Sequence, residues 1–362
     1  MSKRPVNFSA GPAILDESVL AQAAKDVLAL DGLGLSILEI SHRSPTYDAI
    51  ITGTYDRLRR LMNIPETHEL LFLQGGARGQ FAQVPLNFLT EGKRAAYVDT
   101  GKWAQGAVEE GAMLGDAYAL ASSKSKNYNY LPELAGLAPS EDCAYVHTTS
   151  NNTIYGTQWQ TLPDFGSTRH VCDMSSDIMS RPIDVSRFGL IYAGAQKNAG
   201  PAGVTLVIVD KEWMSSGRSD IPVIWQYRTQ AAKQSMYNTP PAFAIYCVGL
   251  VAKWLEGMGG VEAMATINER KAGLVYDTIE ASGGFYRATV ADPTHRSRMN
   301  ITWRLADEAL EPVFVAQAAE AGLSGLKGHR SAGGIRASTY NAMPESGVEQ
   351  LVEFMKAFKA RH

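Results

Sequence analysis

The sequence is poor in the residues that form disulfide frameworks and zinc sites. It has three cysteines in 362 residues, and no two of them form a C-x-x-C pair. Cys143, Cys172 and Cys247 have apolar neighbours along the chain, which is typical of inert core cysteines. The seven histidines show no metal-ligand spacing. The sequence therefore predicts neither disulfides nor a metal site.

Long apolar runs and an excess of one charge are also absent. The longest apolar stretch, residues 242–252, is too short to span a bilayer, and the first residues contain no apolar leader segment. The formal net charge is -3 with both signs interspersed, so no basic face is indicated for nucleic acid or an anionic membrane. We therefore expect a cytoplasmic protein with neither of these partners.

Short predicted strands alternate with predicted helices through most of the chain, whose composition is that of an ordinary globular protein. Between residues 47 and 210 this alternation predicts an α/β fold with a mainly parallel sheet and ligand sites along its carboxyl edge. Glycines within residues 257–260 then mark a hinge before a smaller α+β part. We predict a large domain at 16–257 and a small domain formed by 1–15 and 258–362.

A single cation stands in the small-residue stretch between two apolar runs, residues 190–192 and 204–209. Such runs are typical of buried strands, and the Gly, Ala and Pro between them indicate a tight connection. Lys197 is therefore predicted at a strand end inside the protein. Desolvation there lowers the pKa of the amine and makes it a nucleophile able to form a Schiff base. An ordinary surface-loop lysine is the alternative.

Asp173 ends another apolar run, residues 170–173, twenty-four residues before Lys197. A buried carboxylate needs a partner. An acid against a pyridinium nitrogen, with a lysine holding an aldehyde carbon, is the arrangement expected of a pyridoxal-phosphate site. An Asp–Lys salt bridge would give the same pattern.

A glycine-rich turn follows the predicted strand at residues 70–73. Gly75, Gly76, Ala77, Arg78 and Gly79 lead into an apolar helical run, and this strand–turn–helix geometry aims free backbone N–H groups at a phosphate. The turn matches neither G-x-G-x-x-G nor G-x-x-x-x-G-K-[ST], which weakens a dinucleotide or nucleotide interpretation. The alternative is that the glycines only permit a tight turn.

Two further side chains follow predicted strands. Trp103 opens a predicted helix after the strand at 95–99, and it either packs in the core or offers its ring face to a planar cofactor. Thr153 lies in a polar loop after the strand at 144–147 and could reach the carboxyl edge of the sheet.

Basic residues gather in two loops. His42 and Arg43 lie between two serines, a setting that suits an anionic group or, alternatively, an exposed polar turn. His329, Arg330 and Arg336 stand among glycines in a predicted turn before a strand, which suits bidentate capture of a carboxylate or phosphate.

Six separate segments carry a family resemblance: NFSAGPA, ISHRS, QGGARGQF, CDMSSDIMSRPIDVSRFGLIYAGAQKNAGPAG, MYNTPP and GHRSAGGIRASTYNAMP. Together they resemble the phosphoserine aminotransferase family, which is class V and fold-type I among pyridoxal-phosphate enzymes. The resemblance extends from residue 6 to the C-terminus. It implies a large domain with a mainly parallel, seven-stranded sheet, a smaller C-terminal α+β domain, and a homodimer with shared active sites.

The resemblance also implies roles for individual residues. Lys197 would bind the cofactor aldehyde and move the proton between the substrate α-carbon and the cofactor, while Asp173 would pair with the pyridinium nitrogen. The remaining cofactor contacts would come from Ala77, Arg78, Trp103, Thr153 and Gln196, with Asn238 and Thr239 from the other subunit. Ala77 departs from the family pattern, which has Gly or Ser there, but backbone donors do not depend on that side chain.

For the substrate, the resemblance assigns the α-carboxylate to Arg336, with Ser9 nearby. The distal phosphate of phosphoserine, or the side-chain carboxylate of glutamate, would meet His42, Arg43, His329 and Arg330, some of them across the dimer interface. The implied reaction converts 3-phosphohydroxypyruvate and L-glutamate to O-phospho-L-serine and 2-oxoglutarate. A related substrate of pyridoxine synthesis, 3-hydroxy-2-oxo-4-phosphonooxybutanoate, is also implied.

Other functions remain open at this point. A cysteine desulfurase would need a reactive cysteine on a mobile loop, and the apolar settings of the three cysteines disfavour it. A small-amino-acid aminotransferase, such as the alanine–glyoxylate type, would not need the four distal basic residues together. A non-catalytic phosphate-ligand binder of the same fold would not need Lys197.

Overall fold

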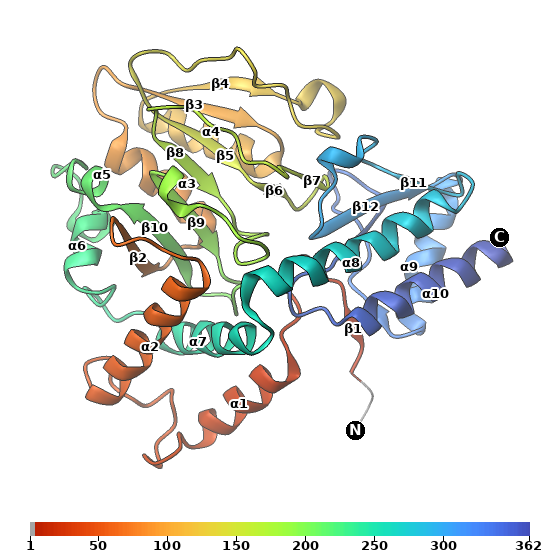
Figure 1. Ribbon diagram of the computed structural model, residues 1–362, viewed down its shortest axis with the longest axis horizontal. Coiled ribbons are helices and arrows are strands. Elements are labelled where there is room, and N and C mark those ends of the chain that lie inside the picture. Colours follow the sequence, from red (N-terminus) through yellow and green to blue (C-terminus); the bar gives the residue numbers. More distant parts are fainter. Residues whose placement is uncertain (1–3) are drawn as a thin grey trace.

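The computed structural model describes residues 4–362, and its larger part is built on one seven-stranded sheet (Figure 1). In spatial order the strands are β2 (His68–Leu73), β10 (Thr205–Asp210), β9 (Leu190–Gly194), β8 (His170–Asp173), β5 (Cys143–Thr149), β3 (Arg94–Asp99) and β4 (Asp116–Ser122). Strand β10 is antiparallel to both of its neighbours, and the remaining pairs are parallel. The predicted mainly parallel α/β sheet is confirmed.

Helices cover both faces of this sheet. One face is covered by α1 (Glu17–Leu28), α2 (Pro45–Leu61) and α7 (Ala242–Gly257), and the other by α3 (Gly76–Phe88), α4 (Lys102–Leu114), α5 (Lys211–Ser215) and α6 (Tyr227–Ala232). Successive side chains of a strand point to opposite faces, so Leu70 and Phe72 join the first core and Leu71 and Leu73 the second. Burial on both faces explains why the strands are almost continuously apolar.

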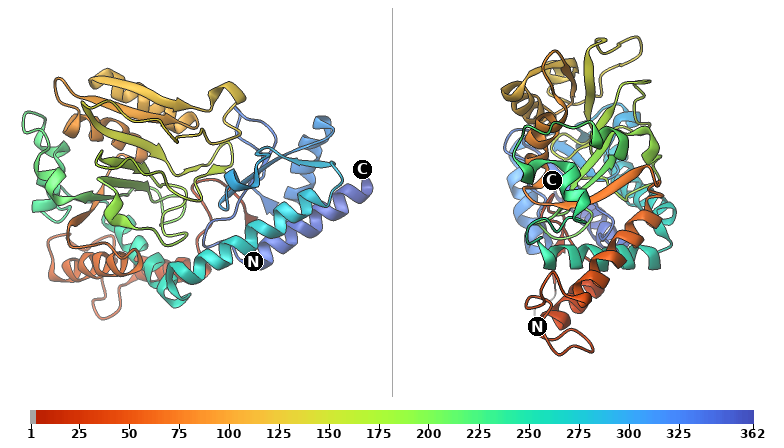
Figure 2. Two further views of the ribbon diagram at one scale, coloured as in Figure 1. Left: turned by 45° about the horizontal axis from the view of Figure 1, so that its top comes forward. Right: turned by 90° about the vertical axis from the view of Figure 1, so that its left-hand side faces the viewer.

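A second, smaller core lies beside the sheet. It contains the antiparallel strands β11 (Tyr286–Ala288), β12 (Asn300–Leu305) and β14 (Ile335–Ser338), and the helices α8 (Gly260–Glu280), α9 (Glu311–Glu320) and α10 (Glu345–Arg361). Figure 2 shows α8 and α10 lying side by side along this part. Two short strands, β1 (Val6–Asn7) and β13 (Leu323–Ser324), pair in parallel, and Phe8 from the N-terminal arm enters the same core.

Helix α8 contributes to both cores. Val261 and Met264 near its start pack in the core of the large sheet, whereas Val275 and Ile279 pack in the smaller core. One helix therefore joins the two parts. The domain boundaries expected from the sequence, 16–257 for the large domain and 1–15 with 258–362 for the small domain, stay a prediction.

Local signals in the sequence explain several boundaries. Asp16 caps α1 by accepting a hydrogen bond from the backbone N–H of Ser18, and Ser44 caps α2 in the same way through Tyr47. Two expectations need correction. Cys143 is half-buried rather than a core residue, and Arg336 lies within strand β14 rather than in the turn before it.

Among residues 4–362, no single helix is long and apolar enough to cross a membrane. The pair α7 and α8, bent by 80°, reaches the required length and composition only when both helices are taken together.

Candidate active site

A cavity of about 250 Å³ lies where the predicted site residues converge. Its walls come from the residues that follow β8 and β9 and from the first turns of α3 and α4. Parallel strands end at one edge of a sheet, so residues far apart in sequence meet there.

Lys197 follows β9 and is half-buried in this cavity. Its amine donates a 2.7 Å hydrogen bond to the Thr153 hydroxyl. Burial lowers the pKa of the amine to about 8; the charge of Asp173 opposes the shift and the charge of Arg336 adds to it. The lysine therefore has the nucleophilic setting predicted for it, and a surface-loop lysine is ruled out.

Asp173 ends β8 and is buried. Its Oδ1 accepts hydrogen bonds from the Ser175 backbone N–H at 2.9 Å and the Ser175 hydroxyl at 2.6 Å. Burial raises the pKa of this carboxyl, and the charge of Lys197 opposes the rise. Among the described residues no ion pair within 4.0 Å joins Asp173 to Lys197, although both line the same cavity. A ligand group placed between them would interact with both.

The first turn of α3 presents free backbone donors to the cavity. Gly75 precedes the helix with a φ of 94°, a conformation that glycine adopts without steric cost, and no side chain caps the helix. The first helical hydrogen bond runs from the Gly79 N–H to the Gly75 carbonyl, so the N–H groups of Gly76, Ala77 and Arg78 have no acceptor within residues 4–362 and can bind an anion.

Trp103, in the first turn of α4, forms another wall. The Arg78 guanidinium carbon lies 5.4 Å from the centroid of its ring, and the Lys197 amine lies 5.9 Å from the same centroid. The ring therefore borders the space next to the Lys197 amine, and its stacking on a planar ligand stays a prediction.

Arg336 reaches this region from β14 of the smaller part. Its Nη1 donates to the Thr153 carbonyl oxygen at 3.3 Å, while its buried Nε has no partner among the described residues. The side-on edge of the guanidinium, formed by Nε and Nη2, is therefore available for a carboxylate. Burial lowers the pKa of this group.

Three other predicted residues lie close to this site. Gln196 lines the cavity next to Lys197. Ser9 packs against Gly325. Burial lowers the pKa of the His329 imidazole, and the nearby charges of Arg336, Arg330 and Lys102 add to this shift. The role of Ser175, which holds Asp173 through two hydrogen bonds, was not predicted from the sequence. The only feature that could have indicated it is a hydroxyl side chain two residues after an acid at a strand end.

Six predicted residues lie at other hollows or are exposed. His329 and Arg330 line a hollow of about 440 Å³ together with Glu308 and Glu311. His42 and Arg43 line a separate hollow of about 550 Å³ together with Lys233, and the buried His42 Nε2 has no partner in the part of the chain that the structure describes. Asn238 and Thr239 are exposed, with the Thr239 carbonyl accepting a 3.1 Å hydrogen bond from the Gln74 side chain. The contacts of His42, Arg43, Asn238 and Thr239 with a partner's site stay a prediction.

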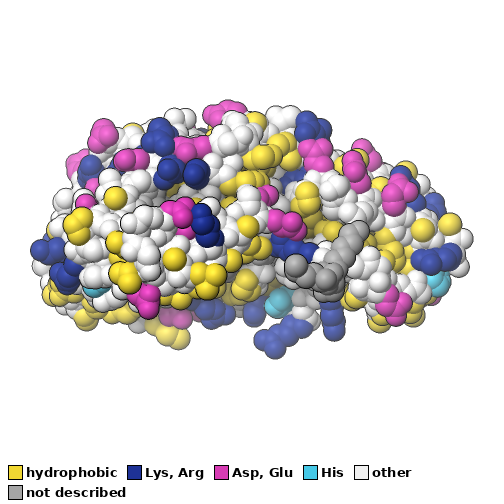
Figure 3. Space-filling view, turned by 90° about the horizontal axis from the view of Figure 1, so that it is seen from below, with side chains coloured by type: hydrophobic (Ala, Val, Ile, Leu, Met, Phe, Trp, Pro, Cys, Tyr) yellow, Lys and Arg dark blue, Asp and Glu magenta, His cyan; other side chains and the backbone are white. Residues whose placement is uncertain are grey.

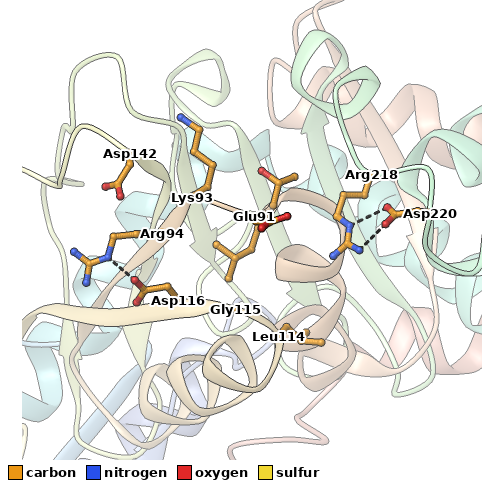
Figure 4. A pocket seen from close by; sticks show the side chains of 12 residues that line it. Glu91, Lys93, Arg94, Leu114, Gly115, Asp116, Asp142, Arg218 and Asp220 are labelled. Atoms are coloured by element: carbon orange, nitrogen blue, oxygen red, sulfur yellow. Dashed lines mark hydrogen bonds and ion pairs between the residues drawn. The ribbon is translucent and has the colours of Figure 1, made fainter.

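A larger hollow, about 700 Å³, lies at the amino ends of β3 and β4 (Figure 4). Arg94 pairs with Asp116 and Arg218 with Asp220, each at 2.8 Å, so its principal charges neutralise one another. On the face of the molecule shown in Figure 3, basic and acidic side chains are likewise interspersed. Neither surface offers the convergent polar groups of the Lys197 cavity.

Comparisons with known proteins agree with this geometry. The family model described as Aminotransferase class-V matches residues 6–351. A phosphoserine aminotransferase of Lysinibacillus sphaericus is 50% identical over 362 residues, covering 100% of both chains. Among solved structures, the phosphoserine aminotransferase from Bacillus circulans subsp. alkalophilus has a TM-score of 0.97 at 48% identity, covering 99% of each chain. The PLP-bound enzyme from Trichomonas vaginalis has a TM-score of 0.93 at 36% identity, covering 98% of this chain and 100% of its own. The chain thus belongs to the class V aminotransferases and, within them, to the phosphoserine aminotransferase family.

Proposed function

We propose that this protein transfers the amino group of L-glutamate to 3-phosphohydroxypyruvate, giving 2-oxoglutarate and O-phospho-L-serine, with pyridoxal 5′-phosphate as cofactor. The observation that carries the proposal is that Lys197 and Asp173 share one cavity without forming an ion pair. Relatives of about 50% identity carry the name phosphoserine aminotransferase, and the Trichomonas vaginalis relative was solved with PLP bound.

The residues of the cavity fit this cofactor. Asp173 has an acceptor oxygen, Oδ2, without a protein donor among the described residues, which suits a protonated pyridine nitrogen. The free N–H groups of Gly76, Ala77 and Arg78 suit the phosphate, and Trp103 suits the flat ring. Gln196 and Thr153 complete the proposed contacts.

When bound, the cofactor supplies an aldehyde that takes up the amino group and a ring that accepts electrons from the substrate α-carbon. The chain supplies the proton transfer. Lys197 Nζ removes the α-proton, which requires a neutral amine, and the lowered pKa keeps part of the amine neutral near pH 8. Thr153, which accepts a hydrogen bond from Nζ, holds the amine in place.

The free side-on edge of Arg336 binds the α-carboxylate common to glutamate and phosphoserine, with Ser9 nearby. His329 and Arg330, from the loop before β14, bind the distal phosphate or carboxylate. Two different anions can occupy one pocket in turn because arginine and histidine donate to both. The longer phosphorylated substrate of pyridoxine synthesis remains a prediction for the same pocket.

We further propose that the protein works as a homodimer in the cytoplasm. Hydrophobic side chains that would favour a partner are exposed at residues 28–38, including Leu28 at 84% and Leu38 at 60%, and again at Trp225. A second copy covering these surfaces would bring His42, Arg43, Asn238 and Thr239 to the site of its partner. Phosphorylated molecules cross membranes poorly because their charges are costly to desolvate. The substrates and the cofactor therefore stay in the compartment where they are made, which favours a cytoplasmic location for the protein.

A cysteine desulfurase is disfavoured by the state of the thiols. Burial raises the pKa of Cys247 to about 11, and it raises the pKa of Cys143 and Cys172 as well. A nucleophilic thiolate would need the opposite shift.

The proposed function is tested by spectroscopy and turnover. Purified protein with pyridoxal phosphate should absorb in the visible range, and glutamate should bleach that band. Lys197→Ala should abolish multiple turnover. Full activity of Lys197→Ala would exclude the mechanism and favour a different use of the fold. Comparing phosphoserine, serine and alanine in single turnovers decides between this reaction and a small-amino-acid aminotransferase.

A further inference from the structure

Three asparagines and one lysine form a buried polar cluster beneath the site. Asn198, Asn268, Lys271 and Asn341 come from the turn after Lys197, from α8 and from the connection between β14 and α10. Each is at most 6% exposed, and Lys271 is fully buried. Buried polar side chains are costly unless satisfied, so such a cluster needs a reason to persist.

The asparagines hold three consecutive backbone carbonyls of the segment that follows Asp173. The Ile178 oxygen accepts a hydrogen bond from Asn198 Nδ2 at 2.6 Å, the Met179 oxygen from Asn341 Nδ2 at 2.8 Å, and the Ser180 oxygen from Asn268 Nδ2 at 3.1 Å. Met179 has a φ of 58°, which is strained for a bulky residue and persists only with support from its surroundings.

The asparagines also bind one another. The Asn341 backbone N–H donates to Asn198 Oδ1 at 2.9 Å, and Asn268 Nδ2 donates to Asn341 Oδ1 at 2.9 Å. Lys271, one turn further along α8 than Asn268, donates to the carbonyl oxygens of Tyr340 at 2.7 Å and Met343 at 3.1 Å. The connection after β14 is therefore tied both to α8 and to the residue next to Lys197.

We propose that Asn198, Asn268 and Asn341 are positioning residues that fix Lys197 relative to Arg336. This rests on the proposed function, in which Lys197 is the reacting amine and Arg336 holds the α-carboxylate. Arg336 lies in β14, five residues before Asn341, whereas Lys197 directly precedes Asn198. The hydrogen bond from the Asn341 N–H to Asn198 Oδ1 links these two segments directly, in addition to Thr153, which is bonded to both Lys197 and Arg336. Small displacements of reacting groups have large effects on rate, so the cluster controls the α-proton transfer without touching the substrate.

The test uses Asn198→Ala, Asn341→Ala and the double variant in the full-length protein. Asn87→Ala is the matched control, because Asn87 is equally buried and donates to the Gln83 and Trp225 carbonyls at 2.8 and 2.9 Å, away from the cluster. We expect each single cluster variant to slow bleaching of the cofactor band by glutamate about tenfold per folded molecule. We expect the double variant to be slowed about equally, because both residues act through one network.

A second measurement does not depend on transamination. In protein without cofactor, the pH dependence of Lys197 modification by an amine reagent, read by mass spectrometry of its peptide, gives the pKa of the amine. Loosening the cluster admits water, so Asn341→Ala should raise that pKa by about half a unit or more, while Asn87→Ala should leave it unchanged.

The outcomes separate the cluster from the proposed function. Suppose that in Asn341→Ala the cofactor band bleaches at the wild-type rate, Lys197 titrates at the wild-type pKa, and only the melting temperature falls. The cluster is then structural and the proposal is wrong. Multiplicative rate losses in the double variant would also overturn it. If wild-type protein does not react with glutamate, the proposed function fails, and the Lys197 titration alone then decides about the cluster. Should the double variant not fold, the single variants decide.

Discussion

At the scale of single residues, the chemistry depends on one amine being neutral. Burial lowers the pKa of Lys197 from 10.5 to about 8, so at pH 7.5 about a quarter of the amine is neutral instead of about one part in a thousand. Because the neutral form removes the proton, the rate of the glutamate half-reaction should rise with pH through about 8 and then level off. Stopped-flow measurement of cofactor bleaching between pH 6.5 and 9.5 checks this, and a flat profile would contradict it.

Arg336 permits a second prediction at this scale. The free Nε–Nη2 edge can bind a carboxylate through two parallel hydrogen bonds, which a lysine amine cannot reproduce. Arg336→Lys should therefore raise KM for L-glutamate about ten- to a hundredfold. In the reverse reaction, KM for phosphoserine should rise by the same factor, because both substrates carry the α-carboxylate. A penalty confined to phosphoserine would instead assign Arg336 to the distal phosphate.

At the scale of elements, the first turn of α3 depends on the left-handed conformation of Gly75. An alanine there is strained, which costs about 1 kcal/mol of unfolding free energy and tilts the free N–H groups. Gly75→Ala should therefore weaken pyridoxal phosphate binding about tenfold. Gly136→Ala is the control, because Gly136 has a φ of 79° with no atom within 4 Å of an added Cβ. It should lose similar stability with unchanged cofactor affinity in equilibrium titrations, and equal losses of affinity in both variants would argue against the α3 phosphate site.

Elements with strong local signals were the ones that the sequence predicted well. The apolar run that ends at Asp173 is β8 with the same bounds, and Asp16 caps α1 as expected. Strand β4 was missed because none of its residues is buried and its short, alanine-rich sequence gives only a weak apolar pattern. The two-residue strands β1 and β13 are defined only by each other. Arg336 was expected in a turn because the glycines before it obscure the start of β14.

At the scale of the whole molecule, the cavity and the cluster behind it depend on pairings between distant segments. Asn341 and Asn198 are 143 positions apart, and neither has a sequence pattern that predicts the contact. The chemistry of Lys197 and Asp173 could be inferred from strand ends, whereas the network that positions them emerged only with the tertiary structure. The predicted roles of His42, Arg43, Asn238 and Thr239 depend in addition on a second chain.

The role of the second chain gives the last prediction. If His42 and Arg43 act in the partner's site, mixing Lys197→Ala with the double variant His42→Ala/Arg43→Ala should restore activity. Random hybrids form half of all dimers, and one of the two sites in each hybrid has both intact sets, so the mixture should reach about a quarter of wild-type activity with phosphoserine.

Lys197→Ala mixed with Arg336→Ala should stay inactive, because Arg336 and Lys197 belong to one chain's site. Subunits are mixed by co-expression, and all dimers are purified together through one tag that both chains carry before the assay. No recovery in the first mixture would place His42 and Arg43 in the same chain's site as Lys197, and recovery in the second would place Arg336 across the interface.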